Sequence, residues 1–155
     1  MYRWIIGLML GGVVLVGLIS GCGGGSEDSE SLTKAEYVKA ADKICAERKK
    51  TWETALASYD KQVKEEKVTT DPEAQEEIAE TVLDESMVPA VNTQLEQMEE
   101  LEAPTEMEQK VTKMLTNFSG EIEEVEKEGV AGLNTTGQFG GFVEEAKALG
   151  LNCQF

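Results

Sequence analysis

From residue 33 onward, the apolar residues of this chain recur in steps of three and four. Such spacing places them along one face of a helix, whereas a half-buried strand would need strict alternation. The stretch from 33 to 67 contains neither Gly nor Pro. Because no period-two alternation competes with this pattern, the sequence predicts an all-α fold.

Capping residues mark where two of the helices begin. Thr33 and Glu36 form a capping box, in which a hydroxyl and a carboxylate bind N–H groups that the helix itself leaves unpaired. Thr105 and Glu108 repeat this arrangement. Each box predicts a helix that starts within a residue or two of its threonine.

Prolines and glycines supply the remaining boundaries. Asp71 followed by Pro72 is typical of an N-cap and a first helical residue. Pro89 lies inside the helix that follows and should kink or split it, because proline lacks an N–H. The Gly-rich stretch over 130–137 is expected to be a connection. Helices are therefore expected over 34–67, 72–102 (kinked near 89), 106–128 and 137–149.

Four helices with short connections predict an antiparallel up-down four-helix bundle, here a domain over 33–155. In that topology the first and last helices run in opposite directions. The end of the fourth helix then lies near the early part of the first, which would bring Cys153 towards Cys45.

The N-terminal segment has the pattern of an export signal. Arg3 precedes a charge-free apolar run over 5–19, which is shorter than the roughly 20 residues that a helix needs to span a bilayer. Residues 19–22 (ISGC) resemble the lipobox of bacterial lipoproteins. This resemblance implies that 1–21 is a cleaved signal peptide, that Cys22 becomes acylated, and that 22–32 is a flexible acidic tether. The alternative is an uncleaved membrane anchor in which the cysteine occurs by chance.

Three cysteines are an odd number for an exported chain. If Cys22 carries lipid, Cys45 and Cys153 remain, and an oxidising compartment favours a disulfide between them. The alternative is that one of them is a functional thiol. A reactive thiol needs a nearby base or cation, and the chain contains no histidine.

Charge restricts the classes of function. The chain has 14 basic and 30 acidic residues, a net charge of −16, which becomes −17 after removal of residues 1–21. Phosphate backbones would be repelled, so we expect no nucleic-acid partner. Carboxylates cluster over 73–85, 96–108 and 121–128. They could take part in acid–base chemistry or bind cations, but solvated helical faces explain them more simply, so we expect no metal and no cofactor.

Three aromatic residues could line a ligand pocket inside the bundle: Trp52, Tyr59 and Phe118. Their spacing also fits the apolar seam, and ordinary core packing is the favoured interpretation.

Two short cysteine motifs and a central element suggest a family. They are residues 40–45 (AADKIC), 98–104 (MEELEAP) and 148–153 (ALGLNC). Together with the lipobox and tether, this frame resembles small secreted lipoproteins of actinobacterial type. Members often end in Cys-Gly, whereas this chain ends Cys-Gln-Phe. The resemblance implies a disulfide-closed helical domain on the outer face of a membrane, and it implies no activity.

The sequence thus favours a membrane-anchored, extracytoplasmic binding or scaffolding module, whose acidic surface would steer a basic envelope protein. The alternative is a carrier of a small molecule or cation in the bundle interior. Catalysis is not expected, because the chain has neither histidine nor a nucleophile motif.

Overall fold

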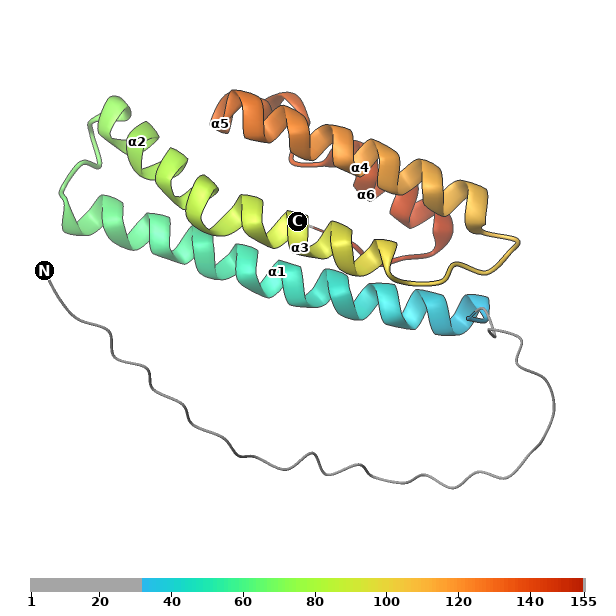
Figure 1. Ribbon diagram of the computed structural model, residues 1–155. Coiled ribbons are helices and arrows are strands. Elements are labelled where there is room, and N and C mark those ends of the chain that lie inside the picture. The colour runs from blue at the N-terminus through green and yellow to red at the C-terminus, as the bar shows by residue number, and fades with distance from the viewer. Residues whose placement is uncertain (1–31, 155) are drawn as a thin grey trace, which may run out of the picture.

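The computed structural model describes residues 32–154, and every regular element in that part of the chain is a helix (Figure 1). This confirms the all-α class for these residues. The expected signal peptide and Cys22 lie outside the described residues. Within 32–154, no helix is both long and apolar enough to cross a membrane.

The longest helix, α1 (Lys34–Glu65), begins at the expected capping box. The Glu36 N–H donates to the Thr33 hydroxyl at 3.4 Å, and the Thr33 N–H donates to the Glu36 carboxylate at 3.0 Å. The helix stops at Glu65 rather than at residue 67. Lys67 has a left-handed backbone, with φ of 59°, which cannot continue a right-handed helix.

The second helical run has three parts: α2 (Pro72–Val82), the π-helical turn η1 (Leu83–Met87) and α3 (Val88–Glu99). In η1, the Val88 N–H donates to the Leu83 carbonyl, five residues back. Pro89 follows directly, and in a regular helix its ring would clash with the carbonyl four residues back. The wider π turn accommodates the proline without ending the run, which changes direction between α2 and α3 (Figure 1).

The capping box expected at Thr105 does not form. Helix α4 (Glu108–Glu128) starts after Met107, whose side chain does not cap it. Instead the Pro104 carbonyl accepts the N–H groups of Met107 at 2.7 Å and Glu108 at 3.0 Å. A backbone turn therefore replaces the expected side-chain cap.

The Gly-rich stretch is not a simple connection, because it contains a short helix, α5 (Val130–Thr135). The Glu80 carboxylate accepts the Val130 N–H at 3.0 Å and so binds the first turn of α5 to α2. The last helix, α6 (Gly140–Leu149), starts after Phe139, which has a left-handed backbone with φ of 64°. It therefore begins at Gly140 rather than at residue 137.

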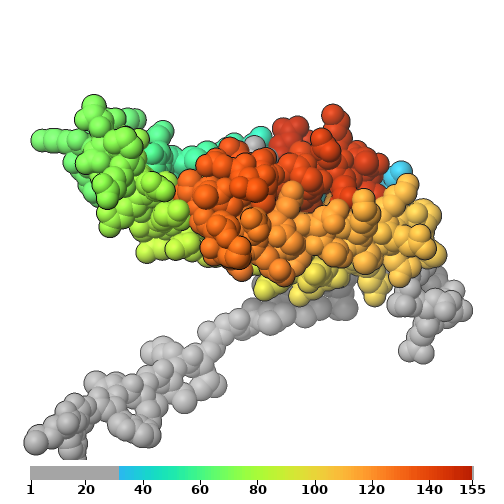
Figure 2. Space-filling view, turned by 90° about the horizontal axis from the view of Figure 1, so that it is seen from above, coloured from blue at the N-terminus to red at the C-terminus, as the bar shows by residue number. Residues whose placement is uncertain are grey.

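The helices pack in two layers. Helix α1 packs against α2, η1 and α3, while α4 packs against α5 and α6, and the contact between α3 and α4 joins the two layers. Figures 1 and 2 both show the turn between α1 and α2 projecting beyond the layer formed by α4, α5 and α6.

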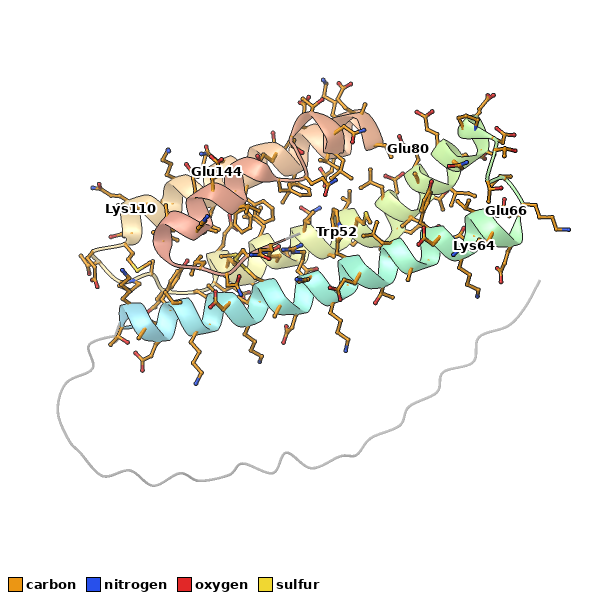
Figure 3. The ribbon with its side chains drawn as sticks, turned by 180° about the vertical axis from the view of Figure 1, so that it is seen from behind. Trp52, Lys64, Glu66, Glu80, Lys110 and Glu144 are labelled. Atoms are coloured by element: carbon orange, nitrogen blue, oxygen red, sulfur yellow. A yellow bond between two sulfur atoms is a disulfide. The ribbon has the colours of Figure 1, made fainter. Side chains whose placement is uncertain are left out.

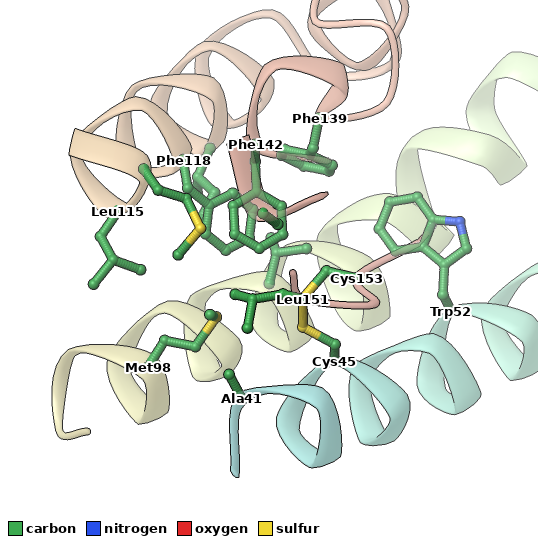
Figure 4. Packing of buried hydrophobic residues seen from close by; sticks show 14 of the residues in the cluster. Ala41, Cys45, Trp52, Met98, Leu115, Phe118, Phe139, Phe142, Leu151 and Cys153 are labelled. Carbon is green, nitrogen blue, oxygen red and sulfur yellow. A yellow bond between two sulfur atoms is a disulfide. The ribbon is translucent and has the colours of Figure 1, made fainter. Parts of the chain in front are cut away.

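Aromatic rings fill the space between the layers (Figure 4). Phe118 of α4 stacks on Phe142 of α6, with ring centroids 4.0 Å apart. Phe139 meets Phe118 edge to face at 5.6 Å, and it meets Trp52 of α1 in the same way at 6.0 Å. Phe139 thus connects α1 to the opposite layer, in the edge-to-face geometry that is one of the two that aromatic pairs prefer.

The segment after α6 is fastened to α1. Cys45 and Cys153 lie at disulfide distance, with Cα atoms 5.1 Å apart, and they join positions 108 residues apart in the sequence (Figure 4). The Asn152 N–H donates to the Asp42 carboxylate at 2.7 Å. Gly150, with φ of 87°, ends α6, and the Leu151 N–H returns to the Ala146 carbonyl at 2.9 Å in a Schellman-type turn.

Candidate functional site

The three aromatic residues proposed for a pocket do not line one cavity. Trp52 and Phe118 are buried and meet the same ring, Phe139, which fills the space between them. Tyr59 lies two turns further along α1 and is only partly buried. The structure therefore uses two of these residues as core and places the third elsewhere.

Tyr59 lines a small apolar hollow between α1, the α2–η1 junction and α5. Its volume is about 140 Å³, and its rim includes Leu56, Val130 and Leu133. Leu56 is 49% exposed, the highest value for a large apolar side chain in the described part of the chain. Pockets for drug-sized ligands measure roughly 300–1,000 Å³, so this hollow has room for only a few methylene groups.

A buried polar cluster joins α1, α3 and the C-terminal segment. Arg48 and Gln94 are only 3% and 1% exposed. Arg48 Nε donates to Gln94 Oε1 at 2.9 Å, and Arg48 Nη2 donates to the Gln154 carbonyl at 2.6 Å. Gln94 Nε2 points at the sulfur of Cys45, 3.3 Å away. Burial lowers the pKa of Arg48 to about 10, so its guanidinium still carries a positive charge at neutral pH.

A groove of about 470 Å³ lies over this cluster, between α1 and the start of α3, and we call it the Arg48 groove. Glu47 lines it from α1, and Glu85 and Ser86 line it from the π turn. Carboxylates and a hydroxyl close to a buried cation suit a polar ligand held by hydrogen bonds. The π turn shapes one wall, and such turns often occur at functional sites.

Several carboxylates act as structural acceptors. Glu121 of α4 accepts the N–H groups of Gly141 at 2.9 Å and Phe142 at 3.1 Å, and so caps the start of α6. Glu145 accepts bonds from Lys113 at 2.6 Å and from Asn117. Across residues 32–154, no group of three or more Cys, Asp or Glu side chains is arranged to hold a metal ion.

A second groove, of about 600 Å³, runs between α3 and α4. Glu99 and Glu123 stand on opposite sides of it, and Leu115 contributes an apolar patch to its lining. Both carboxylates are exposed, so this α3–α4 groove is a negatively charged channel on the surface.

Sequence reasoning did not identify Arg48 and Gln94. The signal was present, because each is a polar residue at a position where the helical pattern calls for an apolar one. Arg48 lies between Cys45 and Trp52 on the buried face of α1, and Gln94 follows Val91 on the buried face of α3. A polar residue at such a position has to find buried hydrogen-bond partners.

Comparisons of the chain with protein-family models, with curated proteins and with solved structures found no match.

Proposed function

We propose that this chain is an extracytoplasmic lipoprotein, anchored by acyl chains on Cys22, whose helical domain binds a basic envelope protein through its acidic surface. In this proposal residues 1–21 are a cleaved signal peptide, and the domain is an antiparallel up-down bundle formed by α1, the α2–α3 run, α4 and α6. Binding or scaffolding, and not catalysis, is its role.

Two features support export and anchoring. The lipobox-like residues 19–22 place a cysteine directly after a short apolar run. The Cys45–Cys153 pair lies at disulfide distance, and disulfides persist in oxidising compartments outside the cytoplasm.

The distribution of charge is the observation that carries the binding role. Residues 66–154 contain 21 acidic and five basic side chains, whereas α1 contains six acidic and eight basic ones. The negative potential is therefore concentrated on the elements after α1, and the α3–α4 groove is one concave part of that surface. Such a field accelerates the approach of a basic partner and weakens as salt is added.

The binding role is tested by capture from solubilised envelope, with chain 22–155 coupled to beads through the thiol of Cys22. The test variant, E99Q/E108Q/E123Q, removes three exposed charges on α3 and α4. The matched control, E53Q/D60N/E65Q, removes three exposed charges from α1.

We expect the wild type and the control to capture one basic protein that the test variant does not capture. Raising the salt concentration from about 0.1 to 0.5 M should release this protein, because the Debye length, roughly 10 Å at 0.1 M, becomes shorter and screens the attraction. A partner that all three chains retain equally would contradict the proposed surface.

The anchor is tested by metabolic labelling with an alkyne fatty acid. Wild-type chain should incorporate the label and sediment with membranes, whereas Cys22→Ala should do neither. Unlabelled wild-type chain in the membrane fraction would instead indicate an uncleaved apolar anchor.

A carrier of a small molecule is the second candidate, and the Arg48 groove is the observation in its favour. Its volume of about 470 Å³ falls within the usual range of ligand sites, unlike the hollow beside Tyr59. A thermal-shift screen with free amino acids and sugars tests it. Stabilisation that Ser86→Phe abolishes by filling the groove would favour the carrier.

A further inference from the structure

Five lysines form a stripe along the outer side of α1, and all of them are exposed: Lys39, Lys43, Lys50, Lys61 and Lys64. At 3.6 residues per turn they fall within an arc of about 60°, and the stripe is roughly 38 Å long. Figure 3 shows nitrogen-tipped side chains projecting from this side of α1, away from the other helices. We call this surface the α1 lysine face.

The α1 lysine face retains its charge in the folded domain. Lys43 and Lys61 each lie 3.8 Å from a carboxylate one turn further on, Glu47 and Glu65, and their side chains are 78% and 72% exposed. Exposed pairs of this kind are weak and exchange readily for other partners. Lys39, Lys50 and Lys64 form no ion pair with any residue in the described part of the chain.

The helix that carries the lysine face is also the first element after the proposed anchor. Thr33 caps α1 and lies 11 residue steps after Cys22. A chain of that length reaches at most about 36–40 Å when fully extended. With acyl chains on Cys22, the start of α1 is therefore held within that distance of the headgroups.

We propose that the α1 lysine face docks on the anionic lipid headgroups of the membrane that holds the anchor. This rests on the proposed lipid anchoring of Cys22. Docking lays α1 against the bilayer and turns the acidic α3–α4 groove away from it, towards other envelope proteins. The lysine face thus determines the orientation of the domain, while the acyl chains retain it at the membrane.

Charge and distance together make this docking favourable despite the negative domain. Each lysine close to an anionic leaflet increases binding roughly fivefold. Six carboxylates of α1 flank or neighbour the lysines, so the gain per lysine should be smaller than that. The acidic residues of α4 and α6 lie in the other layer, and because packed helices are about 8–10 Å apart, they are farther from the membrane than the Debye length of about 8 Å and are screened by salt.

Amine footprinting tests the proposal. The thiol of Cys22 in chain 22–155 is coupled to a maleimide lipid in vesicles of phosphatidylcholine, with or without about a third phosphatidylglycerol. This chain holds every residue that the structure describes. Chemical coupling supplies the anchor whether or not a cell acylates Cys22, so a failure to dock is distinguished from a failure of the proposed anchoring. Acylation of each lysine is then followed by mass spectrometry.

We expect the five lysines of the face to react at least about threefold more slowly on the anionic vesicles, and 0.5 M salt should abolish this protection. Lys110, Lys127 and Lys147, on α4 and α6, should react equally on both kinds of vesicle. Equal rates for the lysine face on both vesicles, or equal protection of both sets of lysines, would overturn the proposal.

Two variants with the same change in net charge sharpen the test. K39Q/K50Q/K64Q should abolish the protection of Lys43 and Lys61, whereas K110Q/K127Q/K147Q should leave it intact.

Soluble poly(glycerol phosphate) is the competing occupant. If it protects the lysine face on neutral vesicles while anionic vesicles do not, the face binds an envelope polymer, and docking on lipid is wrong.

Discussion

Tyr37 shows how a single side chain can oppose the stability of the fold around it. Its ring is fully buried in α1, and its hydroxyl has no hydrogen-bond partner among the described residues. Burial disfavours the phenolate and raises the pKa of Tyr37 to about 12. A buried hydroxyl without a partner loses its bonds to water without compensation.

We therefore predict that Tyr37→Phe raises the free energy of unfolding by about 1 kcal/mol at pH 7. Below pH 10 the tyrosine is neutral in both states, so this difference is constant. Between pH 10 and 12 mainly the unfolded chain ionises, so the wild type loses stability relative to the variant by up to about 2–3 kcal/mol.

Urea unfolding from pH 7 to 11.5 measures this, in a Cys22→Ser background that removes the thiol outside the disulfide. If the difference in the free energy of unfolding between wild type and variant stays constant above pH 10, the Tyr37 hydroxyl is not desolvated in the folded state.

At the residue scale, the sequence could predict a pairing of Cys45 with Cys153 but not the groups around it. The pairing followed from counting cysteines and assigning Cys22 to lipid. The bonds from Arg48 to Gln94 and to the Gln154 carbonyl depend on how α1, α3 and the last residues pack, and such long-range partners have no local sequence pattern.

At the scale of elements, the π turn explains why Pro89 neither ends nor sharply breaks its helix. The buried positions of this run are Ile78, Val82, Leu83, Met87 and Val91, so two adjacent residues are buried where the π turn begins. Because the steps from Leu83 to Met87 and from Met87 to Val91 are both four, the apolar pattern alone also fits a regular helix. The proline therefore predicted a kink or a split, and the pattern gave no sign of the π turn that accommodates it.

The start of α1 was predicted well, because its capping residues, Thr33 and Glu36, are only three positions apart and need no partner from elsewhere in the chain. It failed for α5 and for the start of α6. Both are capped by carboxylates from distant helices, Glu80 and Glu121, which sequence proximity does not reveal.

The cap on α6 yields a prediction at this scale. Glu121→Ala removes two hydrogen bonds and a negative charge from the start of α6, which lacks a side-chain N-cap of its own. We expect a loss of about 1–1.5 kcal/mol in the free energy of unfolding, with faster hydrogen exchange at Gly141 and Phe142.

Glu121→Gln keeps an acceptor and should cost less than the alanine variant. Glu123→Ala, an exposed change on the same helix, is the matched control and should stay within about 0.5 kcal/mol of the wild type. Equal effects of the two alanine variants would show that the cap contributes nothing.

For the whole molecule, the strongest constraint is the closure of the chain by its cysteines. The pair encloses nearly all of the described helices, since it joins positions 108 residues apart. The sequence predicted an all-α chain with these ends brought together. It did not predict that Asn152 and Gln154, on either side of Cys153, would also form hydrogen bonds to α1.

We predict that Cys45→Ala/Cys153→Ala lowers the free energy of unfolding by up to about 4–5 kcal/mol, because a loop of this length loses much of its unfolded-state entropy when it is cross-linked. Reduction of the wild type should shift the urea midpoint equally. A change below about 1 kcal/mol would indicate that the pair is not oxidised in the folded protein.

The same closure governs how the domain bears mechanical load. A force applied between residues 32 and 154 passes along the start of α1 to Cys45, crosses to Cys153 and leaves, so the loop between the two cysteines carries no tension. Only about 14 residue steps lie on that path, and they can lengthen to roughly 50 Å at most. A pull on the two ends would peel off the first turns of α1 and then stop, while the rest of the domain stays folded.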